Sequence, residues 1–149
     1  MILSIIIGSA AAFGLFWTIK TKKIFPGIIT LGMIIGIVLV LIPTTIVKMP
    51  GFYIYMAFVA LAMLYGVIVK ERKIGERIVI TLLSASIFMY WLWVINHWHG
   101  NAVLFAILAF MVGLVAIFRK MNFKTELGFL LILFADSIAI IIENWMIAN

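Results

Sequence analysis

The chain consists of long apolar runs separated by short polar segments. Each of its six runs has close to the ~20 apolar residues that an α-helix needs to cross ~30 Å of hydrocarbon. We therefore predict an all-α membrane protein, a compact bundle of six transmembrane helices in a single domain. The predicted helices cover residues 2–19, 26–47, 52–69, 78–95, 102–118 and 127–147.

Proline and glycine mark the predicted boundaries between the runs. Pro26 opens the second run, where the first turn of a helix tolerates proline. Pro43 lies near the end of that run, and we expect it to kink or terminate the helix. Pro50 and Gly51 together predict a turn before the third run.

The composition agrees with a lipid environment. Hydrophobic residues make up 67% of the chain and charged residues 11%, whereas soluble domains have about half and a quarter. The lipid bilayer is therefore the first predicted partner. The absence of cysteine excludes disulfides, thiolate metal sites and thiol redox chemistry.

Lysine and arginine follow alternate runs. Ten of the 11 lie after the first, third and fifth runs, and four of these fall in 70–77. Short loops rich in Lys and Arg stay in the cytoplasm, so both termini are predicted to lie outside. This retention accounts for the net charge of +6 without nucleic-acid binding. We expect Glu71 and Glu76 to pair with neighbouring Lys and Arg residues.

The cationic loops also suggest an internal period. Lys20, Lys70 and Lys120 are fifty residues apart, which divides the chain into three tandem helical hairpins. The alternative is a division at the central loop into two three-helix halves of opposite orientation, as in many transporters. The three hairpins comprise residues 1–50, 51–100 and 101–149.

Small residues recur at helical spacing in the first two runs. Ser4, Gly8 and Ala12 form one stripe, and Gly32 and Gly36 form a GxxxG pair. Such spacing lets a neighbouring helix approach closely. For Gly32 and Gly36 we favour packing within the chain, with dimerisation as the alternative.

Asp136 is the leading candidate for function. It lies about 13 Å from the inner end of the last predicted helix, close to the bilayer midplane. An aspartate there costs about 2.5 to 3.5 kcal/mol on insertion scales. Because burial penalises the ionised form, we expect Asp136 to be protonated at rest and able to exchange a proton. The structural alternative is a hydrogen bond to Ser84 or Thr81 on a neighbouring helix.

Glu143 follows Asp136 by two helical turns. The spacing places both acids on one face, with Phe129, Leu133 and Ile140. This stripe has one acid at mid-depth and one nearer the outer surface. It predicts a pathway for protons or a small cation, with a structural role as the alternative.

His97 and His99 lie one residue apart in a turn assigned to the outer side. Two imidazoles so placed suggest a metal site or a pH-sensitive site. A third metal ligand would have to be a carboxylate, and Glu143 is at a suitable depth. The alternative is that both are ordinary residues of the membrane interface.

The sequence gives little support for an enzyme. It has no HExxH or GxSxG motif, no phosphate-binding glycine loop and no nucleophile with a base at recognisable spacing. We therefore expect no catalysis and no cofactor. Two functions remain: a multi-pass transporter or channel for protons or a small cation in a cell membrane, taken to be a prokaryotic plasma membrane; or a non-catalytic subunit, chaperone or immunity-type protein that packs against a membrane partner or a second copy.

Overall fold

The computed structural model describes residues 2–42 and 44–148, which form six α-helices and no strand. The predicted all-α bundle of six helices is confirmed. Five helices are long and apolar enough to cross a membrane, and α5, with 16 residues, is shorter. The helices are α1 (Ile2–Thr21), α2 (Ile24–Leu41), α3 (Thr45–Ile68), α4 (Ile74–Ile95), α5 (Val103–Phe118) and α6 (Leu127–Ala148).

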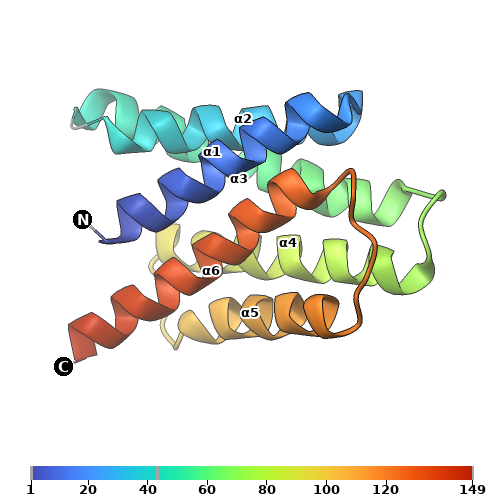
Figure 1. Cartoon of the computed structure of the whole chain (residues 1–149). Helices are drawn as coiled ribbons and strands as arrows, with labels where there is room; N and C mark the ends of the chain where they lie inside the picture. Colours follow the sequence, from blue (N-terminus) through green and yellow to red (C-terminus); the bar gives the residue numbers. More distant parts are fainter. Residues whose placement is uncertain (1, 43, 149) are drawn as a thin grey trace.

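Helix α6 is the centre of the bundle. It packs against α1, α2, α4 and α5, and it crosses the face of the molecule in Figure 1. Its apolar span is 56% buried, against 17% for α1. Helix α3 packs between α2 and α4. Because α6 contacts helices from all three predicted hairpins, the hairpins share one core and do not form separate units.

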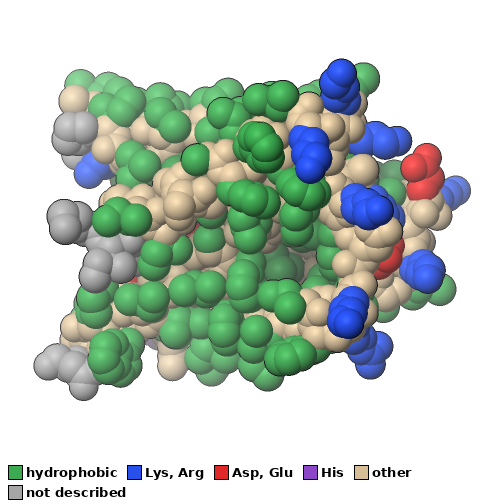
Figure 2. All heavy atoms as spheres, in the orientation of Figure 1, with side chains coloured by type: hydrophobic (Ala, Val, Ile, Leu, Met, Phe, Trp, Pro, Cys, Tyr) green, Lys and Arg blue, Asp and Glu red, His purple; other side chains and the backbone are tan. Residues whose placement is uncertain are grey.

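The turns that follow α1, α3 and α5 meet at one end of the bundle (Figure 1). Figure 2 shows most Lys and Arg side chains gathered there. We call this the cationic end and define it by residues 20–24, 69–73 and 119–126. Helix α1 begins and α6 ends at the opposite end. Between the two ends, large apolar side chains such as Ile28, Ile35 and Leu104 are exposed, as expected for a surface that faces lipid.

Two predicted helix boundaries are wrong. Pro50 and Gly51 lie inside α3 and not in a turn. The connection between the helices comes earlier than predicted, because α2 ends at Leu41 and α3 already begins at Thr45. Pro50 falls in the second turn of the helix, where it removes only one backbone hydrogen bond. Helix α4 begins at Ile74, so part of the predicted 70–77 loop is helical. The expected effect of Pro43 lies outside the described residues.

Glycines bring α2 and α3 into close contact. A Cβ on Gly36 would lie 2.7 Å from the Tyr55 nitrogen, and one on Gly51 would lie 2.5 Å from the Leu39 Cβ. A Cβ on Gly32 would lie 2.3 Å from the ring of Phe58. The GxxxG pair thus packs against α3 of the same chain. Gly51 is likewise a packing residue, which explains a glycine at a position that otherwise resembles a turn.

Candidate functional site

Two buried polar clusters lie along α6. One surrounds Asp136, the tenth residue of the 22 in this helix. The other surrounds Glu126, the residue before its first turn. The two acids are ten positions apart, or about 15 Å along a helix axis. Sequence reasoning identified Asp136 but missed Glu126.

Asp136 accepts two hydrogen bonds from neighbouring helices. The Tyr55 hydroxyl on α3 donates to Oδ2 at 2.7 Å, and the Trp91 Nε1 group on α4 donates to the same oxygen at 3.0 Å. The residue is 3% exposed. The cluster therefore links the middle of α6 to α3 and α4 across the core.

The serine or threonine partner proposed for Asp136 is wrong. Ser84 Oγ is buried without a hydrogen-bond partner among the described residues. Thr81 lies beside Gly66, where a Cβ on the glycine would be 2.6 Å from the Thr81 Oγ1. An aromatic hydroxyl and an indole take their place, because both extend further from the backbone than a serine side chain does.

Close packing holds both donors. Tyr55 is fixed where the backbones of α2 and α3 approach each other at Gly36. The ring of Trp91 meets Phe52 edge to face, with centroids 4.8 Å apart, and meets Tyr90 in the same way at 5.1 Å. The packing of these neighbours therefore preorganises both donors.

Asp136 lines a cavity of about 120 Å³, which is large enough for several water molecules. Among the described residues that line it, Asp136, Tyr55 and Trp91 have polar side chains. Its other lining residues belong to the parts of α1, α2 and α3 furthest from the cationic end. The cavity therefore lies in the half of the bundle opposite that end. These residues are Ile7, Ile37, Val40, Leu41 and Phe52.

Glu143 does not share the environment of Asp136. Phe129, Leu133 and Ile140, which the spacing placed on the same face, are at most 2% exposed. Glu143 itself is exposed near the end of α6. The face predicted to carry both acids is buried only as far as Ile140, so Asp136 alone lies in the core.

His97 and His99 lie in the exposed turn after α4. His97 has a left-handed backbone, with φ of 49°. Within the described residues, no group of three His, Asp or Glu side chains is arranged to hold a metal ion. Glu143 therefore does not complete a metal site with the histidines.

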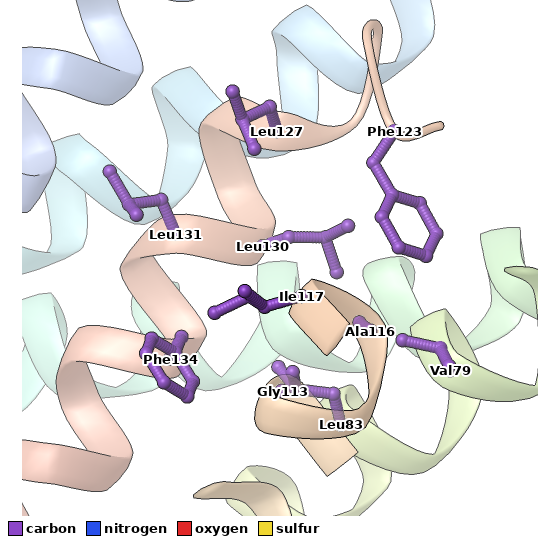
Figure 3. A pocket seen from close by; sticks show the side chains of 10 residues that line it. All are labelled: Val79, Leu83, Gly113, Ala116, Ile117, Phe123, Leu127, Leu130, Leu131 and Phe134. Atoms are coloured by element: carbon purple, nitrogen blue, oxygen red, sulfur yellow. The ribbon is translucent and has the colours of Figure 1, made fainter. Parts of the chain in front are cut away.

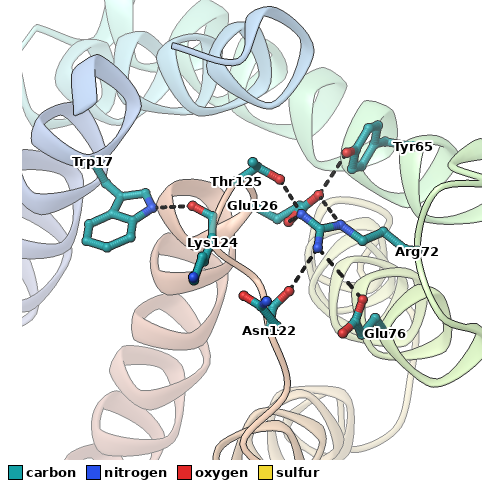
Figure 4. A network of polar contacts seen from close by, with 8 residues as sticks. All are labelled: Trp17, Tyr65, Arg72, Glu76, Asn122, Lys124, Thr125 and Glu126. Atoms are coloured by element: carbon teal, nitrogen blue, oxygen red, sulfur yellow. Dashed lines mark hydrogen bonds and ion pairs between the residues drawn. The ribbon is translucent and has the colours of Figure 1, made fainter. Parts of the chain in front are cut away.

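Glu126 forms the second cluster with Arg72 from the turn between α3 and α4 (Figure 4). The guanidinium binds both carboxylate oxygens, Nε to Oε1 at 3.0 Å and Nη2 to Oε2 at 2.8 Å. The Tyr65 hydroxyl donates to Oε1 at 2.9 Å. Glu126 is fully buried. Arg72 also donates to the Asn122 carbonyl at 3.0 Å, so one side chain ties two turns together.

The predicted pairing of Glu76 with a neighbouring cation occurs only weakly. Its carboxylate lies 3.9 Å from the Arg72 Nη1, one helical turn away. The principal partner of Arg72 is instead Glu126, 54 residues further along the chain. One sequence signal could have identified Glu126: it is an acid at the start of an apolar run, close to the cationic residue Lys124.

A cavity of about 450 Å³ opens at the cationic end beside Glu126. Tyr65, Arg72 and Glu126 line it together with Lys23 and Glu71. This polar cavity and the one at Asp136 lie in opposite halves of the bundle. Each half therefore has a recess lined by a buried acid, Asp136 in one and Glu126 in the other.

A layer of apolar side chains separates the two recesses. Phe129 and Leu133 occupy α6 between the two acids, and Val59 occupies α3 between Tyr55 and Tyr65. All three, with Met33 of α2, are 0% exposed. We call these four residues the apolar seal.

The chain matches no protein-family model, no curated protein and no solved structure. Fold and membrane-spanning character follow from the helices themselves. The function is therefore argued from the geometry of the two acidic clusters and the seal between them.

Proposed function

We propose that this multi-pass membrane protein is a small transporter or channel for protons, with Asp136 as the carrier group. The proposal rests on the surroundings of Asp136 near the middle of α6. This residue is 3% exposed, accepts two hydrogen bonds and lines a cavity of about 120 Å³. A buried acid in a membrane is costly and commonly marks a pathway. Catalysis and a cofactor form no part of the proposal.

Protons fit the Asp136 cavity better than a metal cation does. The hard cations Ca²⁺ and Mg²⁺ need six or more oxygen ligands, whereas, of the described residues that line the cavity, two contribute side-chain oxygens, Asp136 and Tyr55. A proton needs only one carboxyl oxygen. A small monovalent cation remains the second substrate class.

The apolar seal supports alternating access as the mechanism. In this arrangement Asp136 is reached from the recess opposite the cationic end, and Phe129 and Leu133 block the way to Glu126. Transfer requires α6 to shift against α3 so that the seal opens. The Arg72–Glu126 pair ties the start of α6 to the α3–α4 turn, so we assign it the role of the inner gate.

We place the cationic end in the cytoplasm and both chain ends outside. Lys and Arg in short loops set this orientation, and three cationic turns meet at that end of the bundle. The chain would then lie in a cell membrane, which we take to be a prokaryotic plasma membrane. Proton entry at Asp136 would be from outside.

Flux through purified protein in liposomes tests the proposal. Wild type should carry a proton flux, read with a pH-sensitive dye trapped inside, and Asp136→Asn should abolish it. Glu143→Gln is the matched control, since this exposed acid on the same helix should keep most of the flux. Equal flux from wild type and a correctly folded Asp136→Asn protein would remove the assignment.

The second candidate is a non-catalytic subunit that packs against a partner or a second copy. It is favoured by the low coverage of α1, of which 17% is buried, and by the open space around Gly8. Gly8→Leu would then release a co-purifying protein or dissociate an oligomer. If Asp136→Asn is neutral and Gly8→Leu has this effect, the subunit assignment replaces transport.

A further inference from the structure

Two adjoining cavities follow α5 and α6 toward the cationic end, away from Asp136. The first, of about 90 Å³, lies between α4, α5 and α6 (Figure 3). The second, of about 330 Å³, lies at the cationic end beside α1. They form one groove, because four residues line both: Ala116, Ile117, Phe123 and Leu127.

The inner part of this groove is lined by apolar residues and one glycine. Its wall on α6 extends from Leu127 to Phe134, and its wall on α5 includes Gly113 and Ile117. Seven residues of helix span about 10 Å, so the groove reaches well into the hydrocarbon layer. Figure 2 shows a hollow among hydrophobic side chains on this face. An acyl chain is the apolar ligand that a bilayer supplies at this depth.

The outer part of the groove is cationic. Lys120 and Lys124 line it with Trp17 and Asn122. The ammonium group of Lys20 lies 5.2 Å from the centre of the Trp17 ring, which brings a third cation to its edge. No Asp or Glu is among the described residues that line either cavity.

Within the part of the chain that the structure describes, these lysines form no ion pair. The ion pairs among the described residues involve only Arg72, with Glu76 and Glu126. The Trp17 Nε1 group donates to the Lys124 carbonyl at 2.7 Å, which holds the end of α1 against the α5–α6 turn. The end of α1 and the α5–α6 turn therefore form a cationic recess next to the apolar groove.

We propose that this groove binds one anionic phospholipid from the leaflet at the cationic end. The phosphate lies among Lys120, Lys124 and Lys20, and one acyl chain lies between α5 and α6. Charge complementarity selects an anionic headgroup, since basic pockets between transmembrane helices recognise such lipids. The inference does not depend on the role of Asp136.

Lipid binding measured by native mass spectrometry tests this proposal. Protein in mixed micelles with dioleoyl phosphatidylglycerol should retain it in preference to dioleoyl phosphatidylcholine. The double variant Lys120→Gln, Lys124→Gln should bind phosphatidylglycerol about 10- to 30-fold less, since each lysine that neighbours the bound phosphate contributes a factor of about 5. The control is Lys70→Gln, Lys73→Gln, which removes the same charge from exposed positions at the same end and should change binding less than about threefold.

Two results would overturn the proposal: no preference of wild type for phosphatidylglycerol, or an equal loss in the two double variants. The acyl-chain position has its own test. Glycerophosphoglycerol, which has the headgroup without chains, should compete poorly, and Ala116→Phe should fill the groove and displace the lipid. Strong competition by the headgroup, or full binding by a folded Ala116→Phe protein, contradicts the chain position. If Ala116→Phe does not fold, the lysine variants and the competition decide the matter.

Discussion

The Arg72 guanidinium binds both oxygens of the buried Glu126 carboxylate, 54 positions away, at 3.0 and 2.8 Å. Arg72 keeps some contact with solvent, with 19% of its side chain exposed, whereas Glu126 has 0%. The pair therefore fixes the start of the central helix α6 from the turn between α3 and α4. Loss of Arg72 would leave the buried Glu126 carboxylate without a cationic partner.

We expect Arg72→Ala to lower the free energy of unfolding by about 3 kcal/mol, because removing one partner of a buried ion pair costs about this much. Stability would be measured by unfolding in mixed detergent micelles. Lys73→Ala, at an exposed neighbour, is the control and should be nearly neutral. The double variant Arg72→Met, Glu126→Leu should lose less than Arg72→Ala, since no charge stays unpaired. A larger loss in the double variant contradicts this account.

Tyr55→Phe should lower stability by about 1 to 2 kcal/mol, because it removes a hydrogen bond to Asp136. We also expect a changed pH dependence of the flux, since Asp136 loses one of its two hydrogen-bond donors. The variant loses only an oxygen atom, so packing is preserved. Tyr53→Phe, two residues away with a 59% exposed side chain, should alter neither property. Identical flux profiles for the two variants would exclude Tyr55 from the site.

Gly36→Ala should lower the free energy of unfolding by about 1 to 3 kcal/mol, the usual cost of overpacking a core. The added methyl group meets the Tyr55 backbone at 2.7 Å, so α2 and α3 must separate. Gly8→Ala is the matched control, because nothing lies within 4 Å of its added Cβ. It should be neutral or slightly stabilising. Equal stability of the two variants would show that the α2–α3 contact tolerates expansion.

Phe129→Ala should open the apolar seal. The side chain is 0% exposed between the two recesses, and its removal creates a cavity at a cost of about 3 to 5 kcal/mol. We expect protons to leak through the protein without the shift of α6 against α3. The leak would be measured in liposomes as a faster response of the trapped pH-sensitive dye. Phe118→Ala, at an 80% exposed ring, is the control. A folded Phe129→Ala protein without a leak would place the barrier elsewhere.

The orientation predicts the accessibility of inserted tags. A tag between Arg72 and Ile74 should be protected from an impermeant reagent added to intact cells, whereas one fused after the last residue should react. The physical reason is the retention of cationic turns in the cytoplasm. Lysed cells serve as the control in which both tags react. The reverse pattern in intact cells would invert the assigned topology and the direction of proton entry.

Hydropathy and charge order were enough to predict the helices and their common cationic end. Lipid imposes a minimum length on each apolar run, and this information is local. Pro50 and Gly51 show where local reading fails. Both residues are typical of turns, yet α3 continues through them. Position 51 is a glycine because α2 packs so closely that no larger residue fits there. The cause lies on another helix.

By itself the sequence determined that lipid surrounds a six-helix bundle, and that an isolated acid lies near the middle of its last helix. Only the tertiary structure decided which groups meet that acid. Tyr55 and Trp91 are 81 and 45 residues from Asp136 in the chain. It also revealed the pairing of Arg72 with Glu126. Hydropathy depends on each residue's own transfer free energy, whereas these partnerships depend on how six helices pack around α6.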